Sequence, residues 1–329
     1  MTAELDAASR VAARWMRSPE HWPSYTTDLV LEGILALFDA TGDRRYLNFV
    51  LEVWEFRGCP RDSLTIGISC FTCLHAETFR RTRDPRFVKG LVEIADEWMR
   101  TAPRSSEGAV AHRKDPSGAV LLDMLAGYAP LMAAAGVLSG DESFFDECAL
   151  QCRLYRDILR DPATGLWHHA CGWIESGVLS PAGWCRGQGW AIRALIKSLE
   201  QVPASHPSHD ILLNLLRELA ADLLRYQQPS GMWHQLLNEP HSYPETSGSG
   251  FIIRSLQTAC SNGWICAGPA AAQGSKALSA FVAPDGTIRN GCPGTPPMAT
   301  VEDYRQLGPG NDDPHAAAAT LMALAGKQQ

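Results

Sequence analysis

The sequence predicts an all-α fold, in which six inner helices are ringed by six outer ones in an (α/α)6 barrel with short β-stubs in its rim loops. Three observations predict it: six recurring apolar segments, amphipathic segments between them, and a repeated turn that restarts a helix. With 329 residues, 45% of them hydrophobic, the chain can bury one large core, and we expect a single domain over residues 1–329. A straight superhelical solenoid is the structural alternative.

The repeated turn occurs in three segments, "ATGDRRYLNF" (40–49), "RTRDPRFVKG" (81–90) and "LSGDESFFDE" (138–147). Each contains an aspartate that can cap the following helix and an aromatic residue three positions later. Three turns of one design indicate a repeated helix pair.

The apolar segments supply the inner helices. They begin near residues 28, 66, 121, 188, 248 and 314. The segments between them, such as "DPRFVKGLVEIADEWMR" (84–100) and "HPSHDILLNLLRELAADLLRYQ" (206–227), have one apolar face and suit an outer layer.

A second repeat lies in four loops that lead into inner helices, each with a glycine turn followed by alternating residues typical of a short strand. The polar residues four positions after the glycine are His112, His169, Gln235 and Asn290. Inner helices joined through outer ones all run the same way, so their N-termini meet at one rim. The positive ends of those helices favour an anion there.

Asp123 is the polar residue that most needs an explanation, because it lies within "AVLLDMLAGYAPLM" among apolar neighbours. It is either a helix-capping carboxylate or a general acid whose pKa is raised by apolar surroundings. For His112 and His169, an ordinary hydrogen-bonded role and a ligand contact both remain open. The tryptophans of this region are core residues or, as a set, platforms for sugar rings. They are Trp167, Trp184, Trp190 and Trp233.

The segment "GWCRGQGWAIRAL" (183–195) places Arg186 and Trp190 four residues apart at the start of an inner helix, with Gln188 between them. A guanidinium beside an indole is costly to bury unless an anionic or aromatic group interacts with the guanidinium. This segment therefore adds to the candidate ligand contacts at the rim.

Composition narrows the classes of partner. The net charge of −7 and the lack of a basic stripe argue against nucleic acid. No apolar run of about 18 residues and no signal peptide is visible, so we expect a soluble, cytoplasmic protein without a membrane partner. The ten cysteines form neither a disulfide framework nor a zinc motif, and Cys70 and Cys73 are expected to be buried thiols. No pattern requires a metal or a cofactor.

Four segments carry a resemblance to a known family. These are "LLDMLAGYAPLMAAAG", "DPATGLWHHA", "WCRGQGWAIRAL" and "PETSGSGFIIRSL". Together they resemble the unsaturated uronyl hydrolases of glycoside hydrolase families 88 and 105, over nearly the whole chain. The resemblance implies an (α/α)6 barrel and a small acidic oligosaccharide as the partner, such as an unsaturated uronyl disaccharide. It also implies hydration of the C4=C5 double bond of a terminal 4,5-unsaturated uronic acid, with an unsaturated rhamnogalacturonyl hydrolase as the expected activity.

The resemblance also implies roles for particular residues. Asp123 matches the catalytic aspartate, which protonates C4 and assists the addition of water at C5. His112, His169, Arg186 and Trp190 match positions that contact the unsaturated sugar, and Trp184, Gln188 and Trp233 are expected beside them.

The chain departs from the family pattern in three places. Thr65 replaces the second aspartate of the glucuronyl hydrolases, which favours a rhamnogalacturonyl substrate. Cys171 and Gly172 stand where a tryptophan and an acidic residue are usual, and the loop from His169 to Arg186 is short.

Two other classes of function fit the same barrel. A sugar epimerase or isomerase would need two facing histidines and would not need Asp123. A non-catalytic helical scaffold would leave His112, His169 and Arg186 in solvent or in structural pairs.

Overall fold

The computed structural model describes residues 2–17, 24–57, 71–112 and 118–326. This part of the chain is mostly helical, with one antiparallel pair of two-residue strands, β1 (Val120–Leu121) and β2 (Ala170–Cys171). The predicted Thr65 position and the cysteines Cys59 and Cys70 lie outside the described residues.

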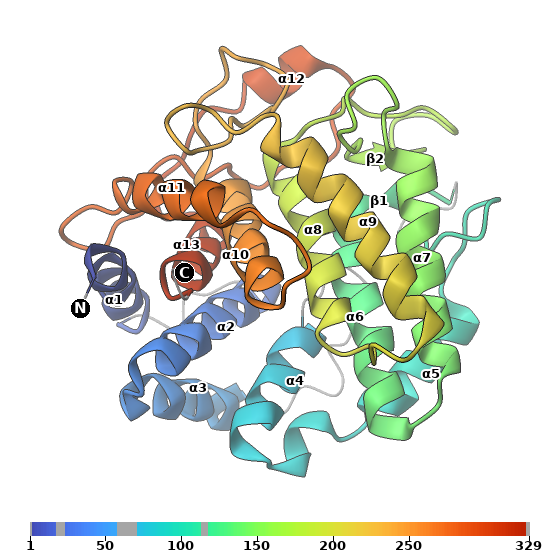
Figure 1. Cartoon of the computed structure of the whole chain (residues 1–329), viewed down its shortest axis with the longest axis horizontal. Helices are drawn as coiled ribbons and strands as arrows, with labels where there is room; N and C mark the ends of the chain where they lie inside the picture. The colour runs from blue at the N-terminus through green and yellow to red at the C-terminus, as the bar shows by residue number, and fades with distance from the viewer. Residues whose placement is uncertain (1, 18–23, 58–70, 113–117, 327–329) are drawn as a thin grey trace.

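Six helices of the described chain surround a common centre (Figure 1). They are α2 (Ser24–Thr41), α4 (Phe71–Thr82), α6 (Leu122–Ser139), α8 (Cys185–Leu199), α10 (Thr246–Ser261) and α13 (Pro314–Leu324). Each packs against the next, and the first of them, α2, also packs against the last, α13. This contact closes a ring, so the solenoid alternative is wrong.

The remaining longer helices pack on the outside of the ring. They are α1 (Ala3–Trp15), α3 (Arg44–Arg57), α5 (Leu91–Thr101), α7 (Ser143–Leu159), α9 (Pro207–Leu224) and α11 (Gly268–Ser279). Two short helices, η2 (Pro85–Val88) and α12 (Val301–Arg305), lie in the connections. As the sequence predicts, α5 and α9 bury one face, whereas α6, α8 and α13 are buried almost throughout.

The predicted helix starts agree with the structure to within a few residues, except for the second. It was expected near residue 66, which lies outside the described residues, and the described part of that helix begins at Phe71. The repeated turns are confirmed. Asp43, Asp84 and Asp141 each accept a hydrogen bond of 3.0 Å from the backbone N–H two residues later, and Tyr46, Phe87 and Phe144 are buried.

The loops that lead into the ring contain the predicted β-stubs. Beyond the β1–β2 pair, antiparallel bridges join Arg104 to Val110, Trp184 to Leu236, and Val282 to Ile288. These loops bring their residues to the end of the ring where the inner helices begin.

Helix α6 is long and apolar enough to cross a membrane by length and composition, which the search for an apolar run did not anticipate. Most of it is buried inside the ring, as in the core helix of a globular domain. Cys73 is a buried free thiol, as predicted, and no disulfide joins the cysteines of the described residues.

The ring has two ends. The N-terminal mouth is the end at which Asp123, Arg186 and Asp313 lie. The C-terminal mouth is the end at which Glu77, Arg193 and Lys197 lie. Because the inner helices run in one direction, their N-termini all lie at one mouth and their C-termini at the other.

Candidate active site

Asp123 is the second residue of α6 and is only 9% exposed. Oδ2 of Asp123 lies 3.2 Å from Nε2 of His169, yet this oxygen has no well-angled hydrogen bond to any described residue. The N-cap position belongs to Leu121, which makes no side-chain cap. The capping interpretation is therefore wrong, and the carboxylate is directed at a histidine.

The backbone places His169 opposite Asp123. Strands β1 and β2 pair Leu121 with Ala170, and the N–H of Leu122 donates to the carbonyl of His169 at 3.0 Å. Two segments that are far apart in sequence are thereby held in register beside the start of α6.

Tyr304 orients the ring of His169. Its hydroxyl oxygen accepts a hydrogen bond from the N–H of Met298 at 3.2 Å and lies 2.8 Å from Nδ1 of His169. The hydroxyl hydrogen is then free to donate to Nδ1, which leaves the proton of the neutral imidazole on Nε2, facing Asp123.

Trp184 supports both His169 and Arg186. The ring centroids of His169 and Trp184 are 3.9 Å apart in a stacked arrangement, and the guanidinium carbon of Arg186 lies 4.9 Å from the Trp184 ring. Arg186 is buried and donates to the carbonyls of Cys292 and Pro293. It therefore holds a loop and supplies a fixed positive charge, whereas its contact with a substrate stays a prediction.

A second carboxylate and histidine complete the mouth, and the sequence analysis missed both. Asp313 caps α13, lies 3.0 Å from Nδ1 of His315, and is 3.9 Å from Arg186. His315 in turn lies 2.9 Å from the hydroxyl of Tyr25. The aspartate before the proline that opens the sixth inner helix is the signal that could have found this pair.

The charges of the mouth determine its protonation. Burial acts to raise the pKa of Asp123, but His169, Arg186 and His315 outweigh it and hold this pKa below its usual value. Burial lowers the pKa of His169, so its imidazole is neutral at pH 7. The prediction that surroundings raise the pKa of Asp123 is therefore wrong for the free protein, because the hydrogen-bonding group of His169 and the positive charge of Arg186 oppose the effect of the apolar neighbours.

The tryptophans do not form an open platform. All four predicted tryptophans are at most 1% exposed. Trp190 packs against Phe251 with ring centroids 4.6 Å apart, and Nε1 of Trp233 donates to the carbonyl of Leu223 on α9. The prediction that they stack on sugar rings is not supported, since neighbouring side chains cover them.

Gln188 also has a structural role, because its amide pairs with both backbone groups of Trp167, at 3.0 and 2.7 Å. Substrate contact is therefore not supported for Gln188.

The four repeated loop positions have different roles. His169 faces Asp123, whereas His112 is half-buried and lies edge-on to Trp173 with centroids 5.2 Å apart. Gln235 donates to the carbonyl of Tyr304, and Asn290 donates to that of Pro244. Two of the four thus tie rim loops together.

The mouth differs from what the alternative functions require. An epimerase needs two opposed histidines, but His169 opposes a carboxylate. A non-catalytic scaffold would leave these polar groups in solvent or in purely structural pairs, whereas His169 lies 3.2 Å from the buried carboxylate of Asp123. No group of three or more His, Cys, Asp or Glu side chains in the described chain is arranged to hold a metal ion.

Comparison with known proteins identifies the family. The profile of Glycosyl Hydrolase Family 88 matches residues 4–327. The chain belongs to this family. It is therefore a glycoside hydrolase, as the resemblance implied.

Relatives within and around family 88 extend over most of the chain. The unsaturated rhamnogalacturonyl hydrolase YesR of Bacillus subtilis is 28% identical over 298 residues, which are 87% of this chain and 83% of that protein. A possible family 105 member from Salmonella enterica superposes with a TM-score of 0.84 at 20% identity, covering 99% of this chain and 94% of its own. The unsaturated glucuronyl hydrolase of Bacillus sp. GL1 gives a TM-score of 0.73 at 18% identity, covering 98% and 95%. These structures share the fold of the chain.

Proposed function

We propose that this chain is an unsaturated rhamnogalacturonyl hydrolase, which hydrates the C4=C5 double bond of a terminal 4,5-unsaturated uronic acid on lyase-generated oligosaccharides. The observation that carries the proposal is the buried carboxylate of Asp123 facing His169 at the N-terminal mouth. Family membership and the similarity to the rhamnogalacturonyl hydrolase of Bacillus subtilis support it. In the same proposal, the closed ring is an (α/α)6 barrel, residues 1–329 are one catalytic domain, and the protein is cytoplasmic.

The reaction needs a single carboxyl group. Asp123 gives its proton to C4, and the electron pair of the C4=C5 bond forms the new C–H bond, which leaves an oxocarbenium ion at C5. Water adds to C5 and returns a proton to the carboxylate. The resulting hemiketal opens at the bond between C5 and the ring oxygen, which leaves a ketone at C5 and a hemiacetal at C1. Breakdown of this hemiacetal releases the next sugar and leaves the former uronic acid as a keto acid.

The protonation of Asp123 changes during the cycle. In the free site its pKa is lowered, so the carboxylate is ionised at pH 7 and suited to act as the base. To act as the acid, it must take up a proton when the substrate binds. Binding of the uronic acid brings a second negative charge next to Asp123 and excludes water. Both effects raise the pKa of Asp123, so that it can take up this proton.

His169 and Arg186 then act as positioning residues. Nε2 of His169 lies 3.2 Å from Asp123, and its N–H, whose position the hydroxyl of Tyr304 sets, stabilises the ionised carboxylate for the water step. The fixed charge of Arg186 opposes the build-up of negative charge when the acidic substrate enters.

The test is the loss of ultraviolet absorbance of the conjugated double bond. Fragments of rhamnogalacturonan, ulvan or glucuronan, and glycosaminoglycan are incubated with wild type, Asp123→Asn and the control Asp39→Asn, which changes a carboxylate at the other mouth. We expect turnover to be fastest with rhamnogalacturonan fragments, to fall about 10³-fold in Asp123→Asn, and to be unchanged in Asp39→Asn. Folded protein that consumes no fragment, or an active Asp123→Asn, would contradict the proposal.

A further inference from the structure

We infer that the C-terminal mouth binds a small organic anion at a site separate from Asp123. A cavity of about 520 Å³ lies there, lined by residues from all six inner helices. Its volume lies within the range of pockets that take small-molecule ligands, which is about 300–1,000 Å³. It lies at the opposite end of the ring from the candidate active site.

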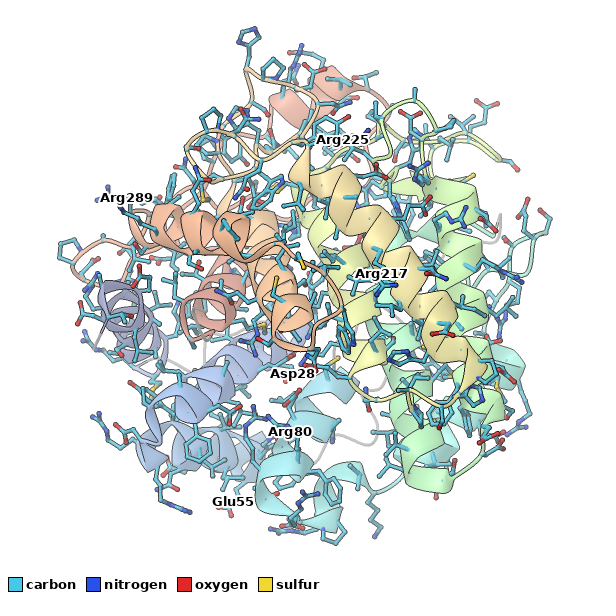
Figure 2. The ribbon with its side chains drawn as sticks, viewed as in Figure 1. Asp28, Glu55, Arg80, Arg217, Arg225 and Arg289 are labelled. Atoms are coloured by element: carbon cyan, nitrogen blue, oxygen red, sulfur yellow. The ribbon has the colours of Figure 1, made fainter. Side chains whose placement is uncertain are left out.

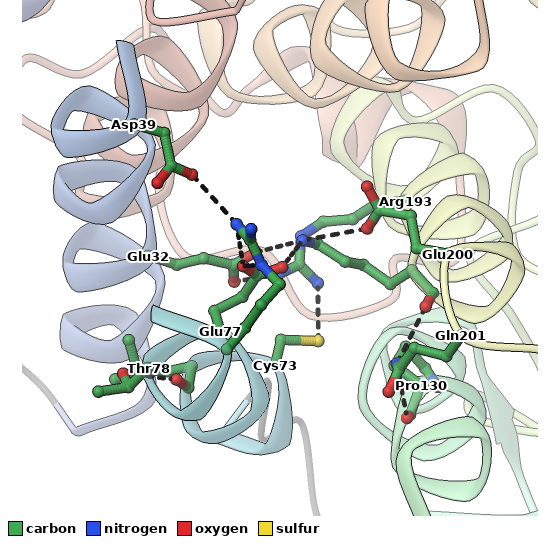
Figure 3. A network of polar contacts seen from close by, with 12 residues as sticks. Glu32, Asp39, Cys73, Glu77, Thr78, Pro130, Arg193, Glu200 and Gln201 are labelled. Carbon is green, nitrogen blue, oxygen red and sulfur yellow. Dashed lines mark hydrogen bonds and ion pairs between the residues drawn. The ribbon is translucent and has the colours of Figure 1, made fainter. Parts of the chain in front are cut away.

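The acidic side chains of this cavity are all paired with basic ones (Figure 3). Lys197 lies 3.1 Å from Glu32, 2.7 Å from Glu77 and 3.5 Å from Glu200. Arg193 also pairs with Glu32. In addition, Asp39 pairs with Arg80 at 3.1 Å, and with Arg81.

The pair of Glu77 with Lys197 is ionised at neutral pH. Burial alone would raise the pKa of Glu77, but Lys197 and Arg81 hold it well below its usual value. The negative charges of the wall are therefore already engaged and do not compete for another cation.

Basic side chains outnumber acidic ones along the wall, six to four. The six are Arg80, Arg81, Arg83, Arg193, Lys197 and Arg254. After the pairing described above, Arg83 and Arg254 have no carboxylate partner among the described residues. Arg83 is exposed and lies just after the end of α4, where a cation complements the helix dipole.

Arg254 has no such explanation. It is half-buried in the middle of α10, about two turns before the helix ends at Ser261, where the charge of the helix end has faded. Neither a hydrogen bond nor an ion pair joins its guanidinium to any described residue. N–H donors of this guanidinium, on the cavity wall, are thus available to an acceptor from outside.

The rest of the wall favours an organic body over a bare inorganic ion. Phe79, Val88, Val137, Ile196 and Met322 line the same cavity. Such a lining suits a ligand with a carboxylate at one end, for Arg254, and a carbon ring whose C–H faces can pack on apolar side chains elsewhere. A small carboxylic acid of sugar size meets both conditions.

Isothermal titration with glucuronate as the probe tests this site. Neutral glucuronamide and inorganic phosphate are the comparison ligands. The variants are Arg254→Gln, the charge-keeping Arg254→Lys, and Arg289→Gln, a matched control at an exposed arginine on the outer edge of the molecule (Figure 2). All are first checked for wild-type unfolding temperature, and Arg254→Lys carries the test if Arg254→Gln does not fold.

We expect glucuronate to bind wild type and Arg289→Gln alike, and to bind Arg254→Gln at least about ten-fold more weakly. Arg254→Lys should bind more tightly than Arg254→Gln, and glucuronamide and phosphate should both bind wild type more weakly than glucuronate. Equal affinities of Arg254→Gln and Arg289→Gln would overturn the inference, as would tight binding of glucuronamide. Phosphate binding as tight as that of glucuronate would also overturn it, because the site would then accept any anion and not specifically an organic one. The titration measures binding that depends on Arg254, whereas the absorbance assay measures turnover that depends on Asp123. Either experiment can therefore contradict its own proposal without affecting the other.

Discussion

The two mouths of the helix ring treat buried charge in opposite ways. At the C-terminal mouth, Glu32 and Arg193 are 5% and 3% exposed and are paired with each other. At the N-terminal mouth, Oδ2 of Asp123 is equally hidden but lacks a well-angled hydrogen bond, and the histidine beside it is neutral. Helix α8 contributes to both, with Arg186 at one end and Arg193 two turns later. The pair of Glu32 with Arg193 stabilises the ring at one end, whereas the less completely paired Asp123 lies in the proposed active site at the other.

The connections explain this difference. Short turns follow most inner helices at the C-terminal mouth, such as residues 140–142 between α6 and α7. Long loops enter the N-terminal mouth, such as residues 160–184 before α8 and 280–313 before α13. Only the long loops have enough chain to bring His169 and Tyr304 over the helix starts.

The largest effect is expected from breaking the paired mouth with Glu32→Gln. It leaves the buried Arg193 and the half-buried Lys197 beside a neutral amide, and we expect the free energy of unfolding to fall by about 3–5 kcal/mol. Urea unfolding measures this loss, and kcat of the folded enzyme should be unchanged. The control Glu302→Gln breaks an exposed pair with Arg305 and should change stability by less than about 1 kcal/mol. Equal losses in both variants would show that the two mouths do not differ.

A smaller effect is expected where α8 and α10 touch beside the N-terminal mouth. A Cβ on Gly248 would lie 2.3 Å from the backbone carbonyl carbon of Cys185, next to Arg186. We expect Gly248→Ala to lower the free energy of unfolding by about 1–3 kcal/mol and to reduce kcat/KM, because the helices must separate. Gly268→Ala, with nothing within 4 Å of its Cβ, is the control for thermal unfolding and turnover. Wild-type behaviour of Gly248→Ala would show that the contact can relax.

Tyr304→Phe tests whether the hydroxyl of Tyr304 orients His169, because the substitution keeps the aromatic ring and its packing at the N-terminal mouth. Without the hydroxyl, the proton of His169 is no longer held on Nε2, so we expect kcat to fall about ten-fold and the pH dependence of turnover to shift. The control Tyr155→Phe removes a buried hydrogen bond of 2.6 Å that joins α7 to the carbonyl of Val110. It should lower stability by about 1 kcal/mol with unchanged kcat. A wild-type pH profile in Tyr304→Phe would show that the hydroxyl of Tyr304 does not set the position of the proton on His169.

The smallest effect is a pH dependence that arises at the N-terminal mouth. Burial lowers the pKa of His169 and of His315, so below pH 6.5 the unfolded chain takes up protons that the folded chain does not. We expect the free energy of unfolding to fall between pH 7.5 and 5.5 by at most about 1.4 kcal/mol in total for each histidine. His169→Gln should show a shallower fall in urea unfolding than wild type, and an equal slope would contradict the assignment. The C-terminal mouth contributes no histidine from its cavity wall within the described residues.

Much of this arrangement was predictable from the sequence. Local patterns sufficed for the six apolar helices, the capping aspartates and the β-stubs, since each depends on residues a few positions apart. The parallel run of the inner helices followed from their alternation with outer ones, and it predicted that Asp123, His169 and Arg186 share one rim. The family motifs pointed to the same residues.

Tertiary structure alone decided what each of those residues does. Phe251, which covers Trp190, and the backbone groups of Trp167, which pair with Gln188, lie more than 20 positions away in the sequence, which no local pattern contains. The pKa of Asp123 depends on three charged or titratable neighbours from other segments, and these reversed the sign expected from its apolar sequence. Tyr304 reaches His169 across 135 positions, and Arg254 faces a cavity that exists only once the ring closes. Residue type and spacing determine which helices form, whereas distances between side chains, and the fields they create, exist only after the helices have packed.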